Sequence, residues 1–434
     1  MESLRWWERQ DPYWDGLYDY NPNVAWSPIA QVRRVAEEKT AHVAKALLRR
    51  TPEEALEAIK DELAFLTHLR LMSAAHLFRT LSMEQFATIG GSRIAKRWTS
   101  YQVLPLYQAG LIDMGTVRHP AMMRWTADVD TGLVRPAKPN VWDRELAPWL
   151  PWTMWLSVTG GVPWTYGRGQ GSDRHNVLTT ELGLRMMEAG EIAMLLPEAL
   201  CDVAGLAGLP PKTRSTGTAD AAMIREDGAR IAIEMTATHG DRGKMAMKIN
   251  KWISALSENN DQARNLSVIF LCAAQDPTSA KPASLRRQVM KTIAACVGET
   301  YATDHVASRI GVANWREWFP GKGLLSQEFL DYSVSVYHPG QGWSRESWAD
   351  GKSPWGPTAQ ESEMLQGAIK QCGTLAGIPL WFRDRKPAQP LAGLLMRGAQ
   401  KTSFPTKSTT TTTVGVATGA VAAAQPPRAL SNRL

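Results

Sequence analysis

Residues 218–236 constrain the fold of this chain more than any other stretch. Two apolar runs of strand length lie on either side of Glu226-Asp227-Gly228. An Asp-Gly pair between two such runs is a strong local signal for a tight turn. The segment therefore predicts a β-hairpin.

The predicted hairpin carries one acid on each strand. If a three-residue loop ends at Gly228 in the left-handed conformation, Arg225 pairs with Ala229, and the same register sets Asp220 opposite Glu234. Side chains opposite each other lie about 4.5–5.5 Å apart at Cβ, where like charges repel. A divalent cation such as Mg²⁺ would offset that repulsion, because it binds hard carboxylate oxygens. A register shifted by one residue would instead place the acids on opposite faces, as ordinary solvated side chains.

Length and charge narrow the class of protein. A chain of 434 residues predicts two or three domains, and its 44% hydrophobic and 21% charged residues are ordinary for a folded protein. The net charge of +7 comes from the tail, because no acid follows Asp384 while seven Lys and Arg do. Such a tail adds sequence-independent affinity for phosphate or simply solubilises the chain.

Cysteine spacing and hydropathy exclude several other classes. The four cysteines form no CxxC pair, which argues against a zinc site and a disulfide framework. No apolar run approaches the length of a membrane span, and the N-terminus lacks the form of a signal peptide. We therefore expect a cytoplasmic protein with no membrane partner.

The segment 69–117 predicts a DNA-binding unit. It reads as helices over 71–78, 83–87 and 92–108 followed by a strand over 111–117, an order typical of the winged helix-turn-helix. Pro105 should kink or shorten the third helix. A helical bundle with a solvated basic face is the alternative. The side chains expected to contact phosphates and base edges of double-stranded DNA are Ser92, Arg93, Lys96, Arg97 and Gln102.

The second half of the chain predicts a sheet covered by helices. A helix over 175–187 precedes the hairpin, and a helix over 244–253, an apolar strand over 266–272 and a helix over 285–297 follow it. Such an order gives an α/β/α sandwich whose central sheet carries the two acids. Lys244 and Lys248 lie one turn apart on the same side of their helix.

This second half resembles the PD-(D/E)XK nuclease superfamily, the restriction-endonuclease core. The arrangement over roughly residues 30–320 resembles the replication-relaxation family of actinobacterial plasmids, phages and integrative elements. Each motif is short, so their order carries more weight than any one of them. The matching segments are Leu104–Ile112, His175-Asn176-Val177-Leu178, and Asp220 with Ile231–Thr236.

The resemblance implies a set of site residues. Asp220 and Glu234 fall on the metal-binding acids, which implies Mg²⁺ as a cofactor, and Glu181 falls near an acid that some members place on the first helix. Thr236 stands where the superfamily has its catalytic lysine, and a hydroxyl cannot carry that charge. Lys244 or Lys248 would replace it, as in members that recruit a lysine from the following helix, or else both face solvent.

Three functions follow as hypotheses. The first is a DNA-binding accessory protein of a mobile element, in which the nuclease-like domain is degenerate. Such a protein would act in replication, relaxation or transfer, with other proteins of that element as partners. The second is a Mg²⁺-dependent endonuclease that uses Asp220 and Glu234. The third is a structural interaction protein in which the 18 tryptophans serve as packing anchors. The missing lysine favours the first, and the sequence leaves the oligomeric state open.

The expected fold class is α+β, with an N-terminal winged helix-turn-helix domain followed by an α/β/α restriction-endonuclease-like domain. The expected segments are an irregular aromatic arm (1–30), a helical and winged-helix DNA-binding domain (31–130), a connector (131–173), the restriction-endonuclease-like domain (174–335), a C-terminal extension (336–400) and a disordered tail (401–434).

Overall fold

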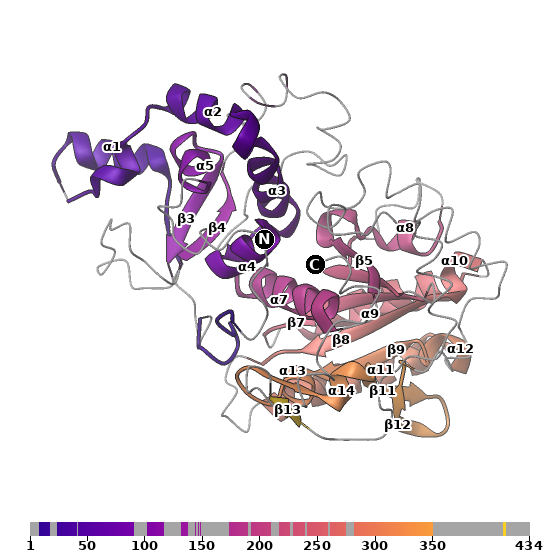
Figure 1. Ribbon diagram of the computed structural model, residues 1–434. Coiled ribbons are helices and arrows are strands. Elements are labelled where there is room, and N and C mark those ends of the chain that lie inside the picture. Colours follow the sequence, from indigo (N-terminus) through magenta and orange to yellow (C-terminus); the bar gives the residue numbers. More distant parts are fainter. Residues whose placement is uncertain are drawn as a thin grey trace.

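The protein has a mixed α+β structure with helices packed on two principal sheets (Figure 1). The computed structural model describes residues 8–17, 24–40, 42–90, 102–116, 132–137, 144, 146, 148, 173–189, 192–209, 217–225, 229–238, 241–258, 261–274, 282–349 and 411–413.

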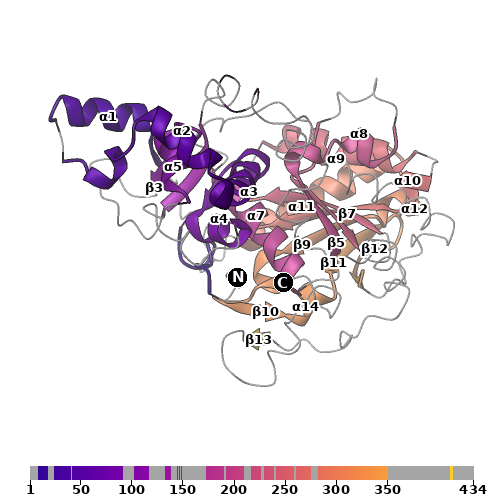
Figure 2. The ribbon, with the colours of Figure 1, turned by 45° about the horizontal axis from the view of Figure 1, so that its top comes forward.

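The N-terminal part surrounds a four-stranded antiparallel sheet of order β1-β3-β4-β2. In Figure 2 this part lies to one side of the larger sheet. Its elements are β1 (Ala25–Ser27), α1 (Ile29–Glu37), the 3-10 helix η1 (Lys45–Leu48), α2 (Pro52–Lys60), α3 (Glu62–Phe78), β2 (Leu81–Ser82), α4 (Met83–Gly90), α5 (Leu104–Gln108), β3 (Ile112–Thr116) and β4 (Gly132–Pro136).

Two local signals explain where helices begin in this part. Thr51 caps α2 through a capping box with Glu54, and Pro52 occupies the first turn, where its missing N–H leaves no hydrogen bond unmade. The helix expected over 92–108, which Pro105 should kink or shorten, is described only from residue 102 onward. The described helix α5 begins at Leu104, so the proline again lies in a first turn.

The C-terminal part is built on a seven-stranded sheet of order β12-β11-β9-β8-β7-β6-β5. Strands β7, β8 and β9 pair in parallel, and the other neighbours pair antiparallel. The elements are α7 (Asp173–Ala189), β5 (Ile192–Pro197), the 3-10 helix η4 (Glu198–Leu200), α8 (Val203–Leu206), β6 (Ala221–Arg225), β7 (Arg230–Thr236), α9 (Arg242–Leu256), α10 (Asp261–Arg264), β8 (Leu266–Cys272), α11 (Pro282–Glu299), α12 (Asp304–Ala307), β9 (Ile310–Asn314), α13 (Trp315–Trp318), β10 (Leu324–Ser326), α14 (Gln327–Leu330), β11 (Ser333–His338) and β12 (Gly342–Ser347).

The hairpin strands divide their side chains between two cores. Met223 and Ile231 belong to a core that includes residues of α7, whereas Ala222 and Ala232 belong to a core that includes α9 and α11. This alternation follows from the two-residue period of a strand. Helices therefore cover both faces of the sheet, as the sequence predicts for a sandwich (Figure 1).

Helix α7 joins the two parts of the molecule. At its start, Asp173 accepts hydrogen bonds from Thr80 Oγ1 (2.7 Å) and from Trp26 Nε1 (3.3 Å). One turn later, Gln85 Nε2 donates to the carbonyl of Val177 over 2.9 Å. These contacts fix the N-terminal elements against the first turns of α7.

The N-terminal segment differs from the expected arm. Residues 8–17 are irregular in secondary structure, yet Arg9, Asp11 and Tyr13 are buried. Tyr13 packs against Trp315, with ring centroids 5.6 Å apart. The segment is thus part of the core, because its aromatic rings and charges have partners far along the chain.

Two expected boundaries and one segment expected to be disordered also need correction. Strand β4 lies inside the expected connector, because it pairs with β3 and completes the first sheet. The boundary at residue 335 cuts through β11, since the sheet continues through the β11–β12 hairpin to Ser347. In the tail expected to be disordered, Thr411–Thr413 forms strand β13 against β10. The sequence also predicts a helix over 359–373, and that segment lies outside the described residues.

Candidate functional site

The β6–β7 hairpin has the register that a three-residue loop predicts. Ala221 pairs with Ile233 and Ile224 with Arg230. One residue before β6, the N–H of Asp220 donates to the carbonyl of Ile233, which continues the same register. Asp220 therefore lies opposite Glu234, and both acids project from one face of the sheet.

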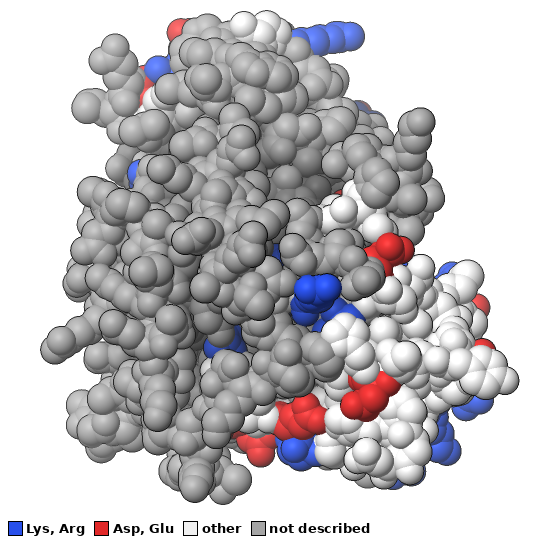
Figure 3. Space-filling model, turned by 90° about the vertical axis from the view of Figure 1, so that its right-hand side faces the viewer, with Lys and Arg blue, Asp and Glu red and all other residues white. Residues whose placement is uncertain are grey.

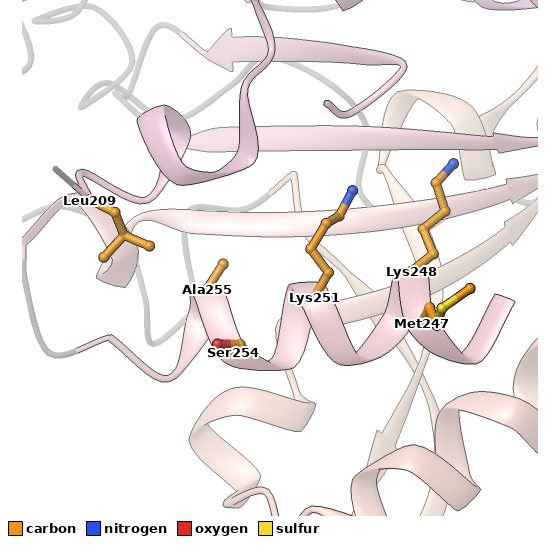
Figure 4. Close-up of a pocket in the computed structure, with 6 residues that line it drawn as sticks. All are labelled: Leu209, Met247, Lys248, Lys251, Ser254 and Ala255. Carbon is orange, nitrogen blue, oxygen red and sulfur yellow. The ribbon is translucent and has the colours of Figure 1, made fainter. Parts of the chain in front are cut away.

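Two lysines of α9 reach the acid pair. Lys248 forms an ion pair with Glu234, and its Nζ lies 3.5 Å from Oδ2 of Asp220. Lys251 places its Nζ 3.6 Å from Oε1 of Glu234. Figure 4 shows both side chains extending from the same face of α9 toward the sheet. The positive charge expected between the two acids is thus supplied in this structure by the ammonium groups of Lys248 and Lys251.

Backbone and indole donors complete the surroundings of the acids. Trp252 Nε1 donates to Oε1 of Glu234 over 2.6 Å, and the N–H of Met235 donates to Oδ2 of Asp220 over 2.7 Å. His175, from the first turn of α7, places Nε2 3.0 Å from the same Asp220 oxygen. The site thus draws on α7, β7, α9 and the residue before β6.

The pKa values of the two acids are shifted in opposite directions. Burial and the neighbouring charge of Asp220 raise the pKa of Glu234 to about 7. Burial opposes ionisation of Asp220 as well, but His175 and Lys248 outweigh it and hold its pKa well below the usual range. The same two acids raise the pKa of Lys248 against the effect of burial. Lys248 is therefore charged at neutral pH.

A cavity of about 330 Å³ opens beside the acid pair. Asp220 and Lys248 lie on its wall, and the cavity reaches from the sheet to the end of α3. A second hollow, of about 420 Å³, lies along α9 and is lined by Leu209, Met247, Lys248, Lys251, Ser254 and Ala255 (Figure 4). Lys248 borders both spaces, which leaves part of its side chain open to each. The first cavity is also lined by Arg79, His175, Glu198 and Thr236.

The donor set matches a hard divalent cation. Mg²⁺ binds through one or two carboxylates and keeps other positions for water and phosphate oxygens. Oε2 of Glu234 is buried, and its partner among the described residues is the Lys248 ammonium. A lone pair directed at one cation is also directed at another that takes its place. The described residues contain no group of three or more His, Cys, Asp or Glu side chains placed to hold a metal, so any ion would rest on these two acids.

Glu181, expected as a further metal ligand, belongs to a different cluster. Its Oε1 accepts from Arg9 (3.2 Å) and Arg185 (3.0 Å), and Oε2 accepts from Gln85 (3.1 Å). Arg9 also pairs with Glu188. All these charges are buried. The Glu181 carboxylate therefore links residues 8–17 to α7 through its contacts with Arg9 and Arg185.

The two lysine candidates separate clearly. Lys244 is exposed at the start of α9, whereas Lys248, one turn later, meets the acids. Thr236, at the position where the resemblance implies a lysine, lines the cavity at the end of β7. The ammonium therefore comes from the helix and not from the strand.

Four of the five expected DNA contacts, Ser92, Arg93, Lys96 and Arg97, lie outside the described residues. The fifth, Gln102, is 4% exposed. A side chain buried to that degree cannot read a base edge, so Gln102 is corrected from a DNA contact to a residue of the protein interior.

Sequence reasoning missed Lys251 and Trp252 as partners of Glu234. They follow Lys248 by three and four residues, so helical spacing alone could have grouped all three side chains. It also gave no role to His175, Arg79 or Glu198. Their meeting depends on how α3 and α7 pack, for which the local sequence carries no signal.

On the described part of the face in Figure 3, Lys and Arg side chains are interspersed with Asp and Glu. In the part of the chain that the structure describes, no helix is both long and apolar enough to cross a membrane. Comparison of the chain with protein-family models, curated proteins and solved structures gave no match. The resemblance to the replication-relaxation family therefore stays a prediction.

Proposed function

We propose that this protein binds double-stranded DNA and hydrolyses a phosphodiester bond at Asp220 and Glu234 with Mg²⁺ as cofactor. The observation that carries the proposal is the position of Lys248. Its ammonium lies against both acids and beside an open cavity, so it supplies the charge that Thr236 lacks. Two acids and a lysine beside a cavity are the minimal set for metal-assisted hydrolysis of a phosphodiester.

Each side chain has a role in this scheme. Asp220 and Glu234 would hold the ion, which when bound activates water and neutralises charge on the phosphate. Lys248, charged and partly open to the cavity, stabilises the negative charge that develops on the phosphate oxygens. Trp252 holds the Glu234 carboxylate in place from behind, and the Met235 N–H does the same for Asp220.

The N-terminal part supports duplex binding. Helices α3 and α4 precede the β3–β4 hairpin, and β2 pairs with the outer edge of β4. That connectivity fits a winged helix, in which the segment before the hairpin enters a major groove. Replacement of Arg93 and Arg97 by alanine should weaken duplex binding and lower its salt dependence by about two phosphate contacts. An unchanged salt slope would exclude this segment as the contact.

One observation favours a second function, a DNA-binding accessory protein of a mobile element without hydrolysis. Glu234 is completely buried, and Lys248, Lys251 and Trp252 already surround its carboxylate. If the Lys248 ammonium is never displaced by a metal ion, it neutralises the two acids permanently. The domain would then add a DNA-binding or protein-binding surface only.

Cleavage of supercoiled and linear DNA in Mg²⁺ or Mn²⁺ separates these functions. The matched control is the Asp220→Ala/Glu234→Ala double variant. Metal-dependent cleavage by the wild type that the double variant lacks supports hydrolysis at this site. Cleavage that survives the double substitution excludes the site, and DNA binding without cleavage leaves the accessory function.

A further inference from the structure

Arg79 lies between the N-terminal part and the acid pair Asp220 and Glu234. It directly follows α3 and has φ of 65°, in the left-handed region that a helix end normally fills with glycine. Thr80, the next residue, donates to Asp173 of α7. The backbone around Arg79 is therefore held close to the start of α7, which carries His175.

The Arg79 guanidinium is engaged by an acid of the other part. Its Nη1 lies 2.9 Å from Oε2 of Glu198, in the 3-10 helix that follows β5. Both side chains line the cavity that holds Asp220 and Lys248. The Arg79 side chain is 34% exposed and that of Glu198 is 21% exposed. An ion pair in this position can be reached from solvent and opened by a competing anion.

The geometry of this pair is that of an occupied anion site. A guanidinium offers a planar fork of donors that suits a carboxylate and a phosphate equally. Lys248 faces the same cavity from α9, so a phosphate bound by Arg79 would also lie in the field of the ammonium. Glu198, in contrast, carries a negative charge that repels the phosphates of a DNA backbone.

We propose that Arg79 binds a backbone phosphate of duplex DNA in this cavity and that Glu198 occupies the arginine until DNA displaces it. This inference rests on the proposed binding of DNA but not on hydrolysis. It assigns the N-terminal part a direct contact with the DNA at the acid pair.

The test is equilibrium binding of a short fluorescent DNA duplex to the full chain in EDTA, so that cleavage plays no part. Arg79→Gln should weaken binding and reduce the slope of log K against log salt by about 0.9, the value for one phosphate contact. Arg79→Lys should keep most of that slope. Arg287→Gln, which removes an exposed arginine of α11, serves as the matched control and should have a smaller effect.

Glu198→Gln gives the sharper result, because it should tighten binding severalfold. The gain should vanish in the Arg79→Gln background, since no arginine is left to release. A gain of equal size in both backgrounds would reveal only a general charge effect and would overturn the proposal. An unchanged slope in Arg79→Gln would overturn it as well. If the wild type fails to bind duplex in EDTA, both this inference and DNA binding fail. If it binds in EDTA but does not cleave DNA in the separate assay with Mg²⁺ or Mn²⁺, only hydrolysis fails.

Discussion

Lys248 places its ammonium nitrogen 3.5 Å from Oδ2 of Asp220 while it forms an ion pair with Glu234. Two acids directly opposite each other across a hairpin would repel each other without a cation. The lysine arrives from α9, which packs on the sheet face from which both acids project. The same contact offsets the repulsion between the acids and holds the Lys248 ammonium where the proposed hydrolysis requires a positive charge.

Replacement of Lys248 by methionine should make the site more responsive to metal. Two acids without their ammonium destabilise the fold by up to about 3 kcal/mol, since part of the lysine is open to solvent. Mn²⁺ should then raise the melting temperature of Lys248→Met more than that of the wild type, because no ammonium competes for the carboxylates. Addition of Asp220→Asn should abolish that difference. Equal shifts in Lys248→Met and wild type would contradict an exchange of ammonium for metal.

Replacement of Trp252 by phenylalanine tests the support behind Glu234. The indole N–H donates to a buried carboxylate over 2.6 Å, and loss of a hydrogen bond to a charged group costs about 1.5–3 kcal/mol. Urea unfolding should show a destabilisation in that range. Trp343→Phe, at a half-buried indole that packs on Tyr337, is the control and should change stability less. A wild-type midpoint for Trp252→Phe would show that the carboxylate does not depend on this donor.

The buried charges that join residues 8–17 to α7 should be essential for stability. Arg9→Met leaves Glu181 and Glu188 without one of their buried partners, and breaking such a network typically costs about 3–5 kcal/mol. Lys60→Met removes a more exposed ion pair with Glu57 and should cost less than about 1 kcal/mol. Denaturant unfolding of both variants measures the contrast. Similar losses in the two would mean that the N-terminal segment does not stabilise the core.

The contribution of the β11–β12 hairpin to folding stability should depend on pH through the titration of His338. Burial alone would lower the pKa of His338, but hydrogen bonds to Asp304 and Glu346 outweigh it and raise the pKa. Because the folded value exceeds the unfolded one of 6.5, the stabilisation is complete below about pH 6.5 and disappears as pH rises through the folded value.

NMR titration of His338 measures this directly. The pKa should fall in Glu346→Gln, and the stability difference between that variant and the wild type should shrink as pH rises above neutrality. A difference that grows with pH would show that His338 is not held in its charged form.

Local chemistry predicted the hairpin well. Asp227-Gly228 between two apolar runs predicts the register in which Asp220 lies opposite Glu234, and strands β6 and β7 pair in that register. Thr51 and Pro52 are likewise local signals for the start of α2. Each of these features depends on residues within a few positions of one another, where propensity and turn geometry decide the outcome.

Long-range packing could not be predicted in the same way. Glu181 has the residue type of a metal ligand, yet Arg9 and Arg185 engage it, and one of them lies at the far end of the chain. Lys244 and Lys248 look alike in sequence, and only the rotation of α9 against the sheet selects Lys248. Buried charge pairs depend on which elements meet, which is a property of the whole fold.

The most direct test of the central claim is the initial rate at which the purified full chain nicks supercoiled DNA in Mg²⁺. We expect cleavage by the wild type and a loss of about 10²–10³-fold in Lys248→Met, the effect of removing one charge-stabilising donor. Lys244→Met, one turn away and exposed, should retain the wild-type rate. Equal rates in Lys248→Met and the wild type, or no cleavage by the wild type in either Mg²⁺ or Mn²⁺, would contradict that claim.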